Sequence, residues 1–412
     1  MPSPSADDRR WHRWLPWLCG LVAFGLAAKN LIGTYADLGI YLDVAREFRA
    51  GGADLFRDRT PAGPWVYPHA AVLPFAGLQA LFGDTATRWI WCGLLGLGAA
   101  LLLRDTARAL AAVGGLHWWQ WVVFGALFQR CIAQNLTHGQ LSLWVGTCTA
   151  AGVVQLQRRR DVGAGVWLGA AAALKLTPLL FLPALVLMRR PRAALSMLAT
   201  IAVAVLLLPW PFCGTAEHLR HLGDFWGTIT ESLTAPEEAA IVRYYAGPTV
   251  HGTLDHLLQA RPFDRDGHTV NVLDVSPAVL TTVKTAWSIA LAALLALLFF
   301  RARRRPEPER IALQASAVML AAVFFAPLVR VYHLAAALLP GALFCRGPRA
   351  RGDLLWWLAA LGILFALTLR QKKLLGETLW RALDAGGLLH FALVAMLCWL
   401  VRENGAPARD RP

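Results

Sequence analysis

Acidic residues suited to proton transfer stand just after the first long apolar run of this chain. Asp37 comes first and Asp43 follows on the same predicted helix, with Glu47 and Asp54 further along. A carboxylate placed there could act as a general base that takes the proton from an attacking hydroxyl. We therefore predict Asp37 as the catalytic base and Asp43 as the second candidate. A surface helix with a solvated acidic face fits the same pattern, so both interpretations stay open at this point.

Amide and imidazole side chains occupy a short connection between two later apolar runs. Its sequence is Asn-Leu-Thr-His-Gly-Gln, and its polar residues suited to binding a sugar are Asn135, His138 and Gln140. Asn-Leu-Thr also matches the acceptor pattern for N-glycosylation, although so short a turn at a membrane face fits that poorly. Hydrogen bonds to a sugar and hydrogen bonds to a neighbouring helix end remain equally good interpretations.

Several cations could hold an anionic group. Lys175 stands inside an apolar run, where an unpaired ammonium costs a few kcal/mol. A functional or paired role is therefore expected for Lys175, with snorkelling to the interface as the alternative. Fixed cations such as Arg330 and His333 could stabilise the charge on a phosphate leaving group. The remaining candidates of this kind are Arg370, Lys372 and Lys373.

The composition indicates the elements that must position these residues. The chain has 412 residues, of which 57% are hydrophobic and 16% are charged, against about a quarter charged in soluble domains. Apolar runs of about 17 to 25 residues recur, and each can cross a bilayer as a helix. The net charge of +14 comes mostly from short arginine clusters between these runs, which are typical of cytoplasmic loops rather than of nucleic-acid binding. We predict an all-α polytopic membrane protein.

The arginine clusters also predict which segments cross. Residues 1–13 are placed inside, and a membrane core covers 14–345, with outer loops at 35–87 and 212–276. If 66–83 spanned the membrane, Arg104 and Arg108 would lie outside, so 66–83 is predicted to be a surface helix. The run between Arg158–Arg160 and Arg189–Arg192 has basic residues at both ends, which predicts a helical hairpin broken around Leu174–Pro178.

The C-terminal region is predicted to hold further membrane helices over 346–402, followed by a polar tail over 403–412. In this arrangement Arg370, Lys372 and Lys373 lie outside, against the usual charge bias. Either the last two spans, 354–370 and 386–401, are miscounted, or these cations have a function at the outer face. The seven cysteines show no metal-binding spacing, and no metal or cofactor is expected.

The order of short motifs resembles glycosyltransferase family 87, the bacterial polyprenol-phosphate-mannose-dependent mannosyltransferases. The motifs are Asp-x-x-x-Tyr at 37–41, Ala-x-x-Phe-x-Ala-Gly-Gly at 45–52, Val-Tyr-Pro-His-Ala-Ala-Val-Leu-Pro at 66–74, His-Gly-Gln at 138–140, Gly-Ala-Ala-Ala-Ala-Leu-Lys-Leu-Thr-Pro at 169–178 and Ala-Pro-Leu-Val-Arg-Val-Tyr-His at 326–333. The chain departs from the family at His69, where a proline is usual, and at His333, which stands alone where two histidines are usual.

The resemblance implies a C-type glycosyltransferase fold with about 10–12 transmembrane helices or half-helices and surface helices at the outer face. It implies that Asp37 is the acidic catalytic residue and that Tyr41, Tyr67 and His69 help to bind substrate. The expected reaction is an inverting transfer of a sugar, mannose in the family, from a polyprenyl phosphate to a lipid or glycan hydroxyl. The expected place is the outer face of a bacterial inner membrane. A transporter or flippase of a lipid-linked precursor is the alternative, but no internal repeat of the kind common in transporters is found.

Overall fold

The computed structural model consists of helices joined by turns and loops, with no strand among the residues that it describes. By contacts the chain divides into two compact units. We call residues 5–108 and 132–235 the N-terminal unit, and residues 1–4, 109–131 and 236–412 the C-terminal unit. The described residues are 6–32, 37–51, 55–56, 65, 67–234, 249–262, 267–326, 330–347, 353–369 and 375–405.

Five helical segments among the described residues are long and apolar enough to cross a membrane, and a bent pair of helices makes a sixth if it counts as one span. The prediction of an all-α polytopic membrane protein is therefore confirmed. The other expected spans correspond to shorter or more polar helices, such as α5 (Ser142–Gln157) and α14 (Leu354–Leu364). The five segments are Trp14–Leu31, His69–Ala111, Pro277–Arg304, Glu307–Phe325 and Glu377–Asn404.

The N-terminal unit begins with α1 (Ala6–Leu31), α2 (Asp37–Arg49), the short helix η1 (His69–Val72) and the long helix α3 (Leu73–Ala111). A straight helix as long as α3 would measure nearly 60 Å at about 1.5 Å per residue, about twice the hydrocarbon thickness. The helix is broken at Gly83, which has a φ of 72°. The predicted separation of 66–83 from the following span is thus confirmed, while its position at the membrane surface stays a prediction.

The part of α3 before Gly83 has one face on α2 and one exposed face. Gln79 donates a hydrogen bond of 3.0 Å to the Leu42 carbonyl, whereas Leu81 is 76% exposed. Such a short apolar face suits an interfacial helix. After the break, α3 packs against α1, where a Cβ atom on Gly96 would come within 2.7 Å of the Gly20 carbonyl oxygen.

The predicted broken hairpin is confirmed. Helix α6 (Asp161–Leu174) ends at Lys175, whose backbone is extended, and the chain continues through η2 (Thr177–Leu180) and α7 (Phe181–Leu187). Arg190 lies at the N-terminus of the next helix, α8 (Pro191–Ala202), and its Nη1 lies 3.1 Å from Asp161 Oδ1. The two flanks of the apolar run therefore meet at the same end of the N-terminal unit, as the arginine clusters predicted.

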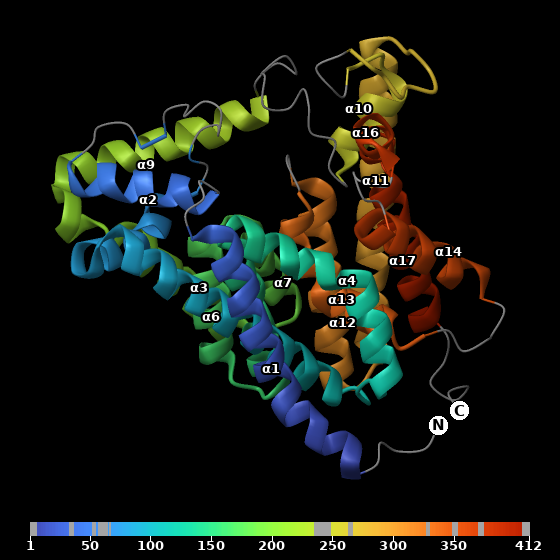
Figure 1. Cartoon of the computed structure of the whole chain (residues 1–412). Helices are drawn as coiled ribbons and strands as arrows, with labels where there is room; N and C mark the ends of the chain where they lie inside the picture. The colour runs from blue at the N-terminus through green and yellow to red at the C-terminus, as the bar shows by residue number, and fades with distance from the viewer. Residues whose placement is uncertain are drawn as a thin grey trace. The chain divides into compact units, whose positions relative to one another are not determined.

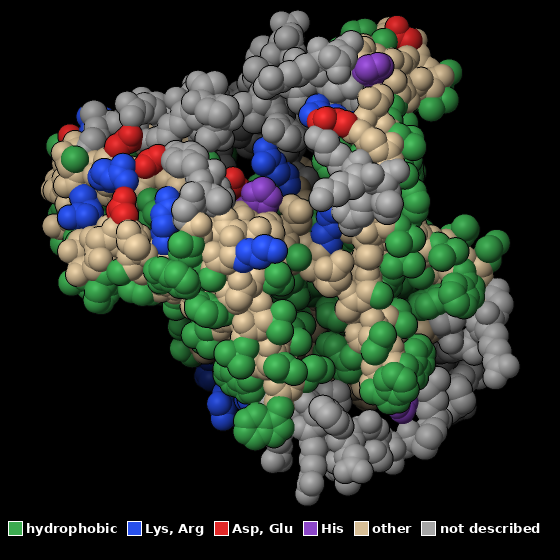
Figure 2. All heavy atoms as spheres, viewed as in Figure 1, with side chains coloured by type: hydrophobic (Ala, Val, Ile, Leu, Met, Phe, Trp, Pro, Cys, Tyr) green, Lys and Arg blue, Asp and Glu red, His purple; other side chains and the backbone are tan. Residues whose placement is uncertain are grey.

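A π-helical segment, η3 (Val203–Leu207), follows α8. The chain then bends by 89° into α9 (Trp210–Thr234). Helix α9 runs beside α2 in the N-terminal unit (Figure 1). Acidic and basic side chains gather over α2, while many hydrophobic side chains cover the surface over α1 and α3 (Figure 2). On the face shown in Figure 2, charged side chains of this unit thus lie over α2.

The C-terminal unit contains the first part of α4 (Trp118–His138) and the helices that follow residue 248. These are α10 (Val250–Leu258), α11 (Pro277–Arg301), η4 (Ala302–Arg304), α12 (Glu307–Phe325), η5 (Val331–Ala337), α13 (Leu338–Phe344), α14, η6 (Phe365–Leu369), α16 (Glu377–Ala385) and α17 (Leu388–Gly405). Ser276 caps α11 by accepting a hydrogen bond from the Val279 N–H, and Pro277 occupies the first turn, as is typical of helix N-termini.

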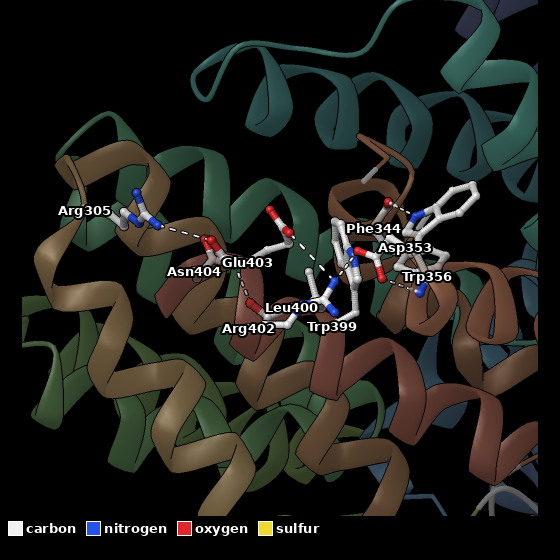
Figure 3. Close-up of polar contacts among 9 residues, drawn as sticks. All are labelled: Arg305, Phe344, Asp353, Trp356, Trp399, Leu400, Arg402, Glu403 and Asn404. Atoms are coloured by element: carbon white, nitrogen blue, oxygen red, sulfur yellow. Dashed lines mark hydrogen bonds and ion pairs between the residues drawn. The ribbon is translucent and has the colours of Figure 1, made fainter. Parts of the chain in front are cut away.

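Helices α14 and α17 form an antiparallel pair. Asp353, just before α14, accepts hydrogen bonds from Trp399 and Arg402 near the end of α17 (Figure 3). Further along the pair, a Cβ atom on Gly362 would come within 2.9 Å of the Ala392 Cβ. This arrangement supports the two predicted spans, 354–370 and 386–401. The cations that made them doubtful, Arg370, Lys372 and Lys373, fall outside the described residues.

Candidate functional site

Asp37 is the first residue of α2, and its carboxylate is held by a residue from a distant part of the chain. Gln140 Nε2 donates a hydrogen bond to Asp37 Oδ2. The other carboxylate oxygen, Oδ1, lies 4.0 Å from His138 Nδ1, and the Asp37 side chain keeps 25% of its surface exposed. The carboxylate is therefore oriented by Gln140 on one side and partly exposed on the other.

Two tyrosines orient the Gln140 amide. Tyr41 Oη donates a hydrogen bond of 2.9 Å to Gln140 Oε1, and Tyr67 Oη lies 3.3 Å from the same oxygen. Both hydroxyls bind the amide oxygen, so the amide nitrogen points to Asp37. The three residues that the motifs suggested, together with Asp37, thus form one hydrogen-bonded group, which we call the Asp37 cluster: Asp37, Tyr41, Tyr67 and Gln140.

Aromatic rings surround the two tyrosines. The Trp65 ring lies 5.0 Å from Tyr67 and 5.5 Å from Tyr41, and the Phe75 ring lies 5.1 Å from Tyr41. Trp65, Tyr41 and Phe75 are nearly or fully buried. Rings of this kind add packing energy of roughly 0.5–1.5 kcal/mol per pair beyond the burial of their area. They hold the hydroxyls of the Asp37 cluster in a low-dielectric surrounding, where hydrogen bonds are stronger than in water.

Lys175 lies beside the Asp37 cluster at the break between α6 and η2. Its Nζ is 3.4 Å from Ser142 Oγ and 5.6 Å from the centre of the Tyr67 ring. The predicted paired role is supported, because the ammonium contacts polar and aromatic groups. The break in the apolar run explains the position of the charge: the extended backbone at Lys175 ends α6 where the polar residues of the unit gather.

Asn135 and Gly139 shape the connection that carries His138 and Gln140. The Asn135 carbonyl accepts a hydrogen bond of 2.9 Å from the Gln140 N–H, and the Asn135 residue is fully buried. A buried amide does not fit a glycan acceptor, so the interpretation as an N-glycosylation site is not supported. Gly139 has a φ of 72°, in the left-handed region that favours glycine.

His69 belongs to a different group. Its Nε2 lies 3.0 Å from His218 Nδ1 on α9, and its ring centre lies 5.9 Å from that of His221. All three histidines are buried. His69 therefore connects η1 to α9, and a role in binding substrate stays a prediction. Among the described residues no group of histidine, cysteine or carboxylate side chains is arranged to hold a metal ion.

The structure separates Asp43 from the Asp37 cluster. Asp43 lies six residues after Asp37, which places the two side chains about 120° apart around the α2 axis at about 3.6 residues per turn. It pairs with Arg46 at 3.1 Å, and Arg46 also lies 2.8 Å from Asp84. The hydrogen bond to Asp84 raises the pKa of the Arg46 guanidinium. Asp43 thus takes part in a charged surface network, and Asp37 is the better candidate for the base.

Arg330 and His333 lie next to each other in the C-terminal unit. The backbone N–H of Arg330 donates a hydrogen bond of 3.1 Å to His333 Nδ1 at the start of η5. Because Nδ1 accepts this hydrogen bond, the neutral ring carries its proton on Nε2. That N–H is suited to donate to a phosphate oxygen, so the predicted role of this pair is chemically consistent.

A buried ion pair lies in the same unit. Asp255 on α10 pairs with Lys284 on α11, and Arg261 Nη1 lies 3.7 Å from Asp255. Burial lowers the pKa of the neighbouring His256, so this imidazole is neutral at pH 7. The sequence analysis did not single out these residues. A lysine near the start of an apolar helix, Lys284, was the signal that could have indicated the pair.

Comparison with known proteins identifies the family. The model of glycosyltransferase family 87 matches residues 65–329, which is more than half of the chain. The match begins at Trp65, so Gln140 and Lys175 fall within it, whereas Asp37 and Tyr41 precede it.

One relative is a polyprenol-phosphate-mannose-dependent alpha-(1-2)-phosphatidylinositol mannoside mannosyltransferase from Mycobacterium tuberculosis (strain ATCC 25618 / H37Rv). It is 35% identical over 231 residues, which cover 50% of this chain and 53% of the relative. The chain thus spans about half the length of the curated relative it matches. No solved structure matches the chain. Because the family model matches more than half of the chain, the chain belongs to glycosyltransferase family 87.

Proposed function

We propose that this protein transfers mannose from a polyprenyl-phosphate donor to a hydroxyl of a lipid or glycan acceptor, with inversion at the sugar carbon and at the outer face of the membrane. The family and the name of the relative support the donor and the sugar. A phosphatidylinositol mannoside, named for the relative, is one acceptor of the proposed class. Family membership favours this reaction over the transport of a lipid-linked precursor.

The observation that supports the proposal most directly is the hydrogen bond from Gln140 to Asp37. An acceptor hydroxyl beside the open carboxylate oxygen would lose its proton to Asp37 as its oxygen attacks the sugar carbon. The bond between that carbon and the phosphate oxygen breaks at the same time, and the prenyl phosphate leaves with the negative charge. A single displacement of this kind inverts the configuration at the carbon.

Lys175 lies beside the Asp37 cluster, and its ammonium group is proposed to stabilise the leaving phosphate. Arg330 and His333 remain proposed phosphate ligands in the C-terminal unit. The proposed leaving group is a lipid phosphate and not a nucleotide diphosphate. The reaction as proposed therefore does not need the metal ion that assists a nucleotide diphosphate to leave, and we propose no cofactor.

The distribution of charge in the N-terminal unit supports the proposal that the Asp37 cluster lies at the outer face of the membrane. Helix α5 starts beside the Asp37 cluster at Ser142 and ends before Arg158, and α6 returns from Asp161 to Lys175. The Asp37 cluster therefore lies at one end of these two helices, and the arginines Arg158–Arg160 lie at the other end, where Arg190 pairs with Asp161. Because arginine-rich loops face the cytoplasm, the cluster would face the other side.

The test is sugar transfer by the purified protein in detergent or liposomes, with radiolabelled polyprenyl-phosphate-mannose and a lipid acceptor. Asp37→Asn should lower kcat by about 10²-fold or more, because a general base contributes roughly 10²–10⁴-fold. Asp43→Asn on the same helix is the matched control and should keep activity near that of the wild type. Full activity of Asp37→Asn would exclude it as the base, and an inactive wild type with every lipid acceptor tried would count against the reaction itself.

A further inference from the structure

The turn that carries His138 and Gln140 packs tightly on the junction between α1 and α2. A Cβ atom on Gly139 would come within 2.8 Å of the Leu38 Cβ and 3.3 Å of Leu31 Cδ1. The positive φ of Gly139 also favours glycine at this position. Gly139 has no side chain that could fix the turn against α2. Another group must therefore hold the turn in place if the Gln140 amide is to keep its hydrogen bond to Asp37.

Trp91 on α3 provides such a group. Its indole Nε1 donates a hydrogen bond of 2.9 Å to the Gly139 carbonyl, which lies between His138 and Gln140. The residue is 3% exposed, so this bond is shielded from water. A backbone carbonyl bound in this way fixes the peptide from which the Gln140 side chain extends.

The same tryptophan also supports the tyrosine side of the cluster. The Trp91 ring lies 4.5 Å from the Phe75 ring, and the Phe75 ring lies 5.1 Å from that of Tyr41. Tyr41 in turn donates to Gln140 Oε1. Trp91 therefore reaches the Gln140 amide by two routes, one through the backbone and one through a stack of rings.

Arg88, one helical turn before Trp91, holds the end of α1 in a similar way. Its Nη1 donates a hydrogen bond of 3.1 Å to the carbonyl of Leu31, the last residue of α1. Residues three apart on a helix share one face. One face of α3 thus donates hydrogen bonds to the last residue of α1 and to the turn that carries Gln140.

We propose that Trp91 is a positioning residue for the transfer reaction: it holds the 138–140 turn so that the Gln140 amide orients the Asp37 carboxylate toward the acceptor. The proposal rests on the proposed function, in which Asp37 is the base. It assigns a role to a residue that does not itself contact the substrate.

The test compares Trp91→Phe with the wild type. The phenylalanine ring keeps a partner for Phe75 but cannot donate to the Gly139 carbonyl. The matched control is Trp144→Phe on α5, because the Trp144 indole N–H is not hydrogen-bonded within the part of the chain that the structure describes. Two quantities are measured for each protein: hydrogen exchange of the peptide covering 135–142, and kcat and KM for polyprenyl-phosphate-mannose.

Trp91→Phe should speed exchange in that peptide and lower kcat by about 5-fold to 100-fold with KM for the donor within about twofold, because a small misplacement of the base affects the chemical step. Trp144→Phe should change neither quantity. Unchanged exchange at 135–142, or a loss that appears in KM alone, overturns the proposal. If the wild type does not turn over the donor, the proposed function fails, and the exchange measurement alone decides whether Trp91 holds the turn.

Discussion

The side-chain amide of Gln140 donates a hydrogen bond to the carboxylate of Asp37, although 103 positions separate the two residues in the chain. Removal of this donor should weaken the orientation of the base. Gln140→Ala is expected to lower kcat/KM by about 10-fold to 100-fold, the size of a lost hydrogen bond to a charged group. The assay is mannose transfer by purified protein. Gln129→Ala, at an exposed position on α4, serves as the control, and equal activity of the two variants would count against the role of Gln140.

Lys175 should act on the donor rather than on the acceptor. Replacement of Lys175 by Gln removes a positive charge beside Tyr67, so the KM for polyprenyl-phosphate-mannose should rise by about tenfold, and kcat should fall because the same charge is proposed to stabilise the leaving phosphate. Lys175→Arg keeps the charge and should recover much of the affinity. A rise in KM for the acceptor with no change for the donor would contradict the assignment of Lys175 to the phosphate.

The antiparallel pair α14 and α17 depends on Asp353, which is mostly buried. Its carboxylate accepts hydrogen bonds from the Trp356 N–H, Trp399 Nε1 and Arg402 (Figure 3). Asp353→Ala leaves these donors without their acceptor and should lower the free energy of unfolding by about 1–3 kcal/mol. Thermal unfolding in detergent measures the change, and Arg304→Ala, at an exposed position, is the control. An unfolding temperature equal to that of the wild type would show that the network adds little stability.

The orientation of the N-terminal unit can be tested by labelling single cysteines in intact cells. The background has its native cysteines replaced, and the two test variants are Thr137→Cys and Arg159→Cys. A membrane-impermeant reagent should label position 137 in intact cells and position 159 only after the membrane is opened, because the two lie at opposite ends of α5. The reverse pattern would place the Asp37 cluster in the cytoplasm and exclude an outer-face reaction.

Much of the topology could be predicted because charge and hydropathy act locally. An arginine cluster strongly disfavours transfer across the bilayer wherever the rest of the chain lies, so the clusters around Arg159 and Arg190 predicted the broken hairpin, and the Asp161 to Arg190 contact confirms it. The same reasoning separated 66–83 from the next span, where the structure has the break at Gly83.

The candidate site could be predicted only in part. Its members were recognised by residue type and by motif order, which identified Asp37, Tyr41, Tyr67, Gln140 and Lys175. Asp43 is also a carboxylate and lies close to Asp37 in the sequence, but it stands on another side of α2, where it pairs with Arg46. His218 and His221 went unnoticed, although their spacing of three places them on one face of a helix.

The sequence by itself determined that this is a membrane protein, where its charged loops fall and which residue types are available for chemistry, because each of these follows from side chains and their near neighbours. Only the tertiary structure decided that Gln140 meets Asp37, that His69 turns to α9 instead, and that Trp91 lies under the turn at Gly139. Such contacts join distant segments, and their geometry depends on how whole helices pack, which no local pattern of residues records.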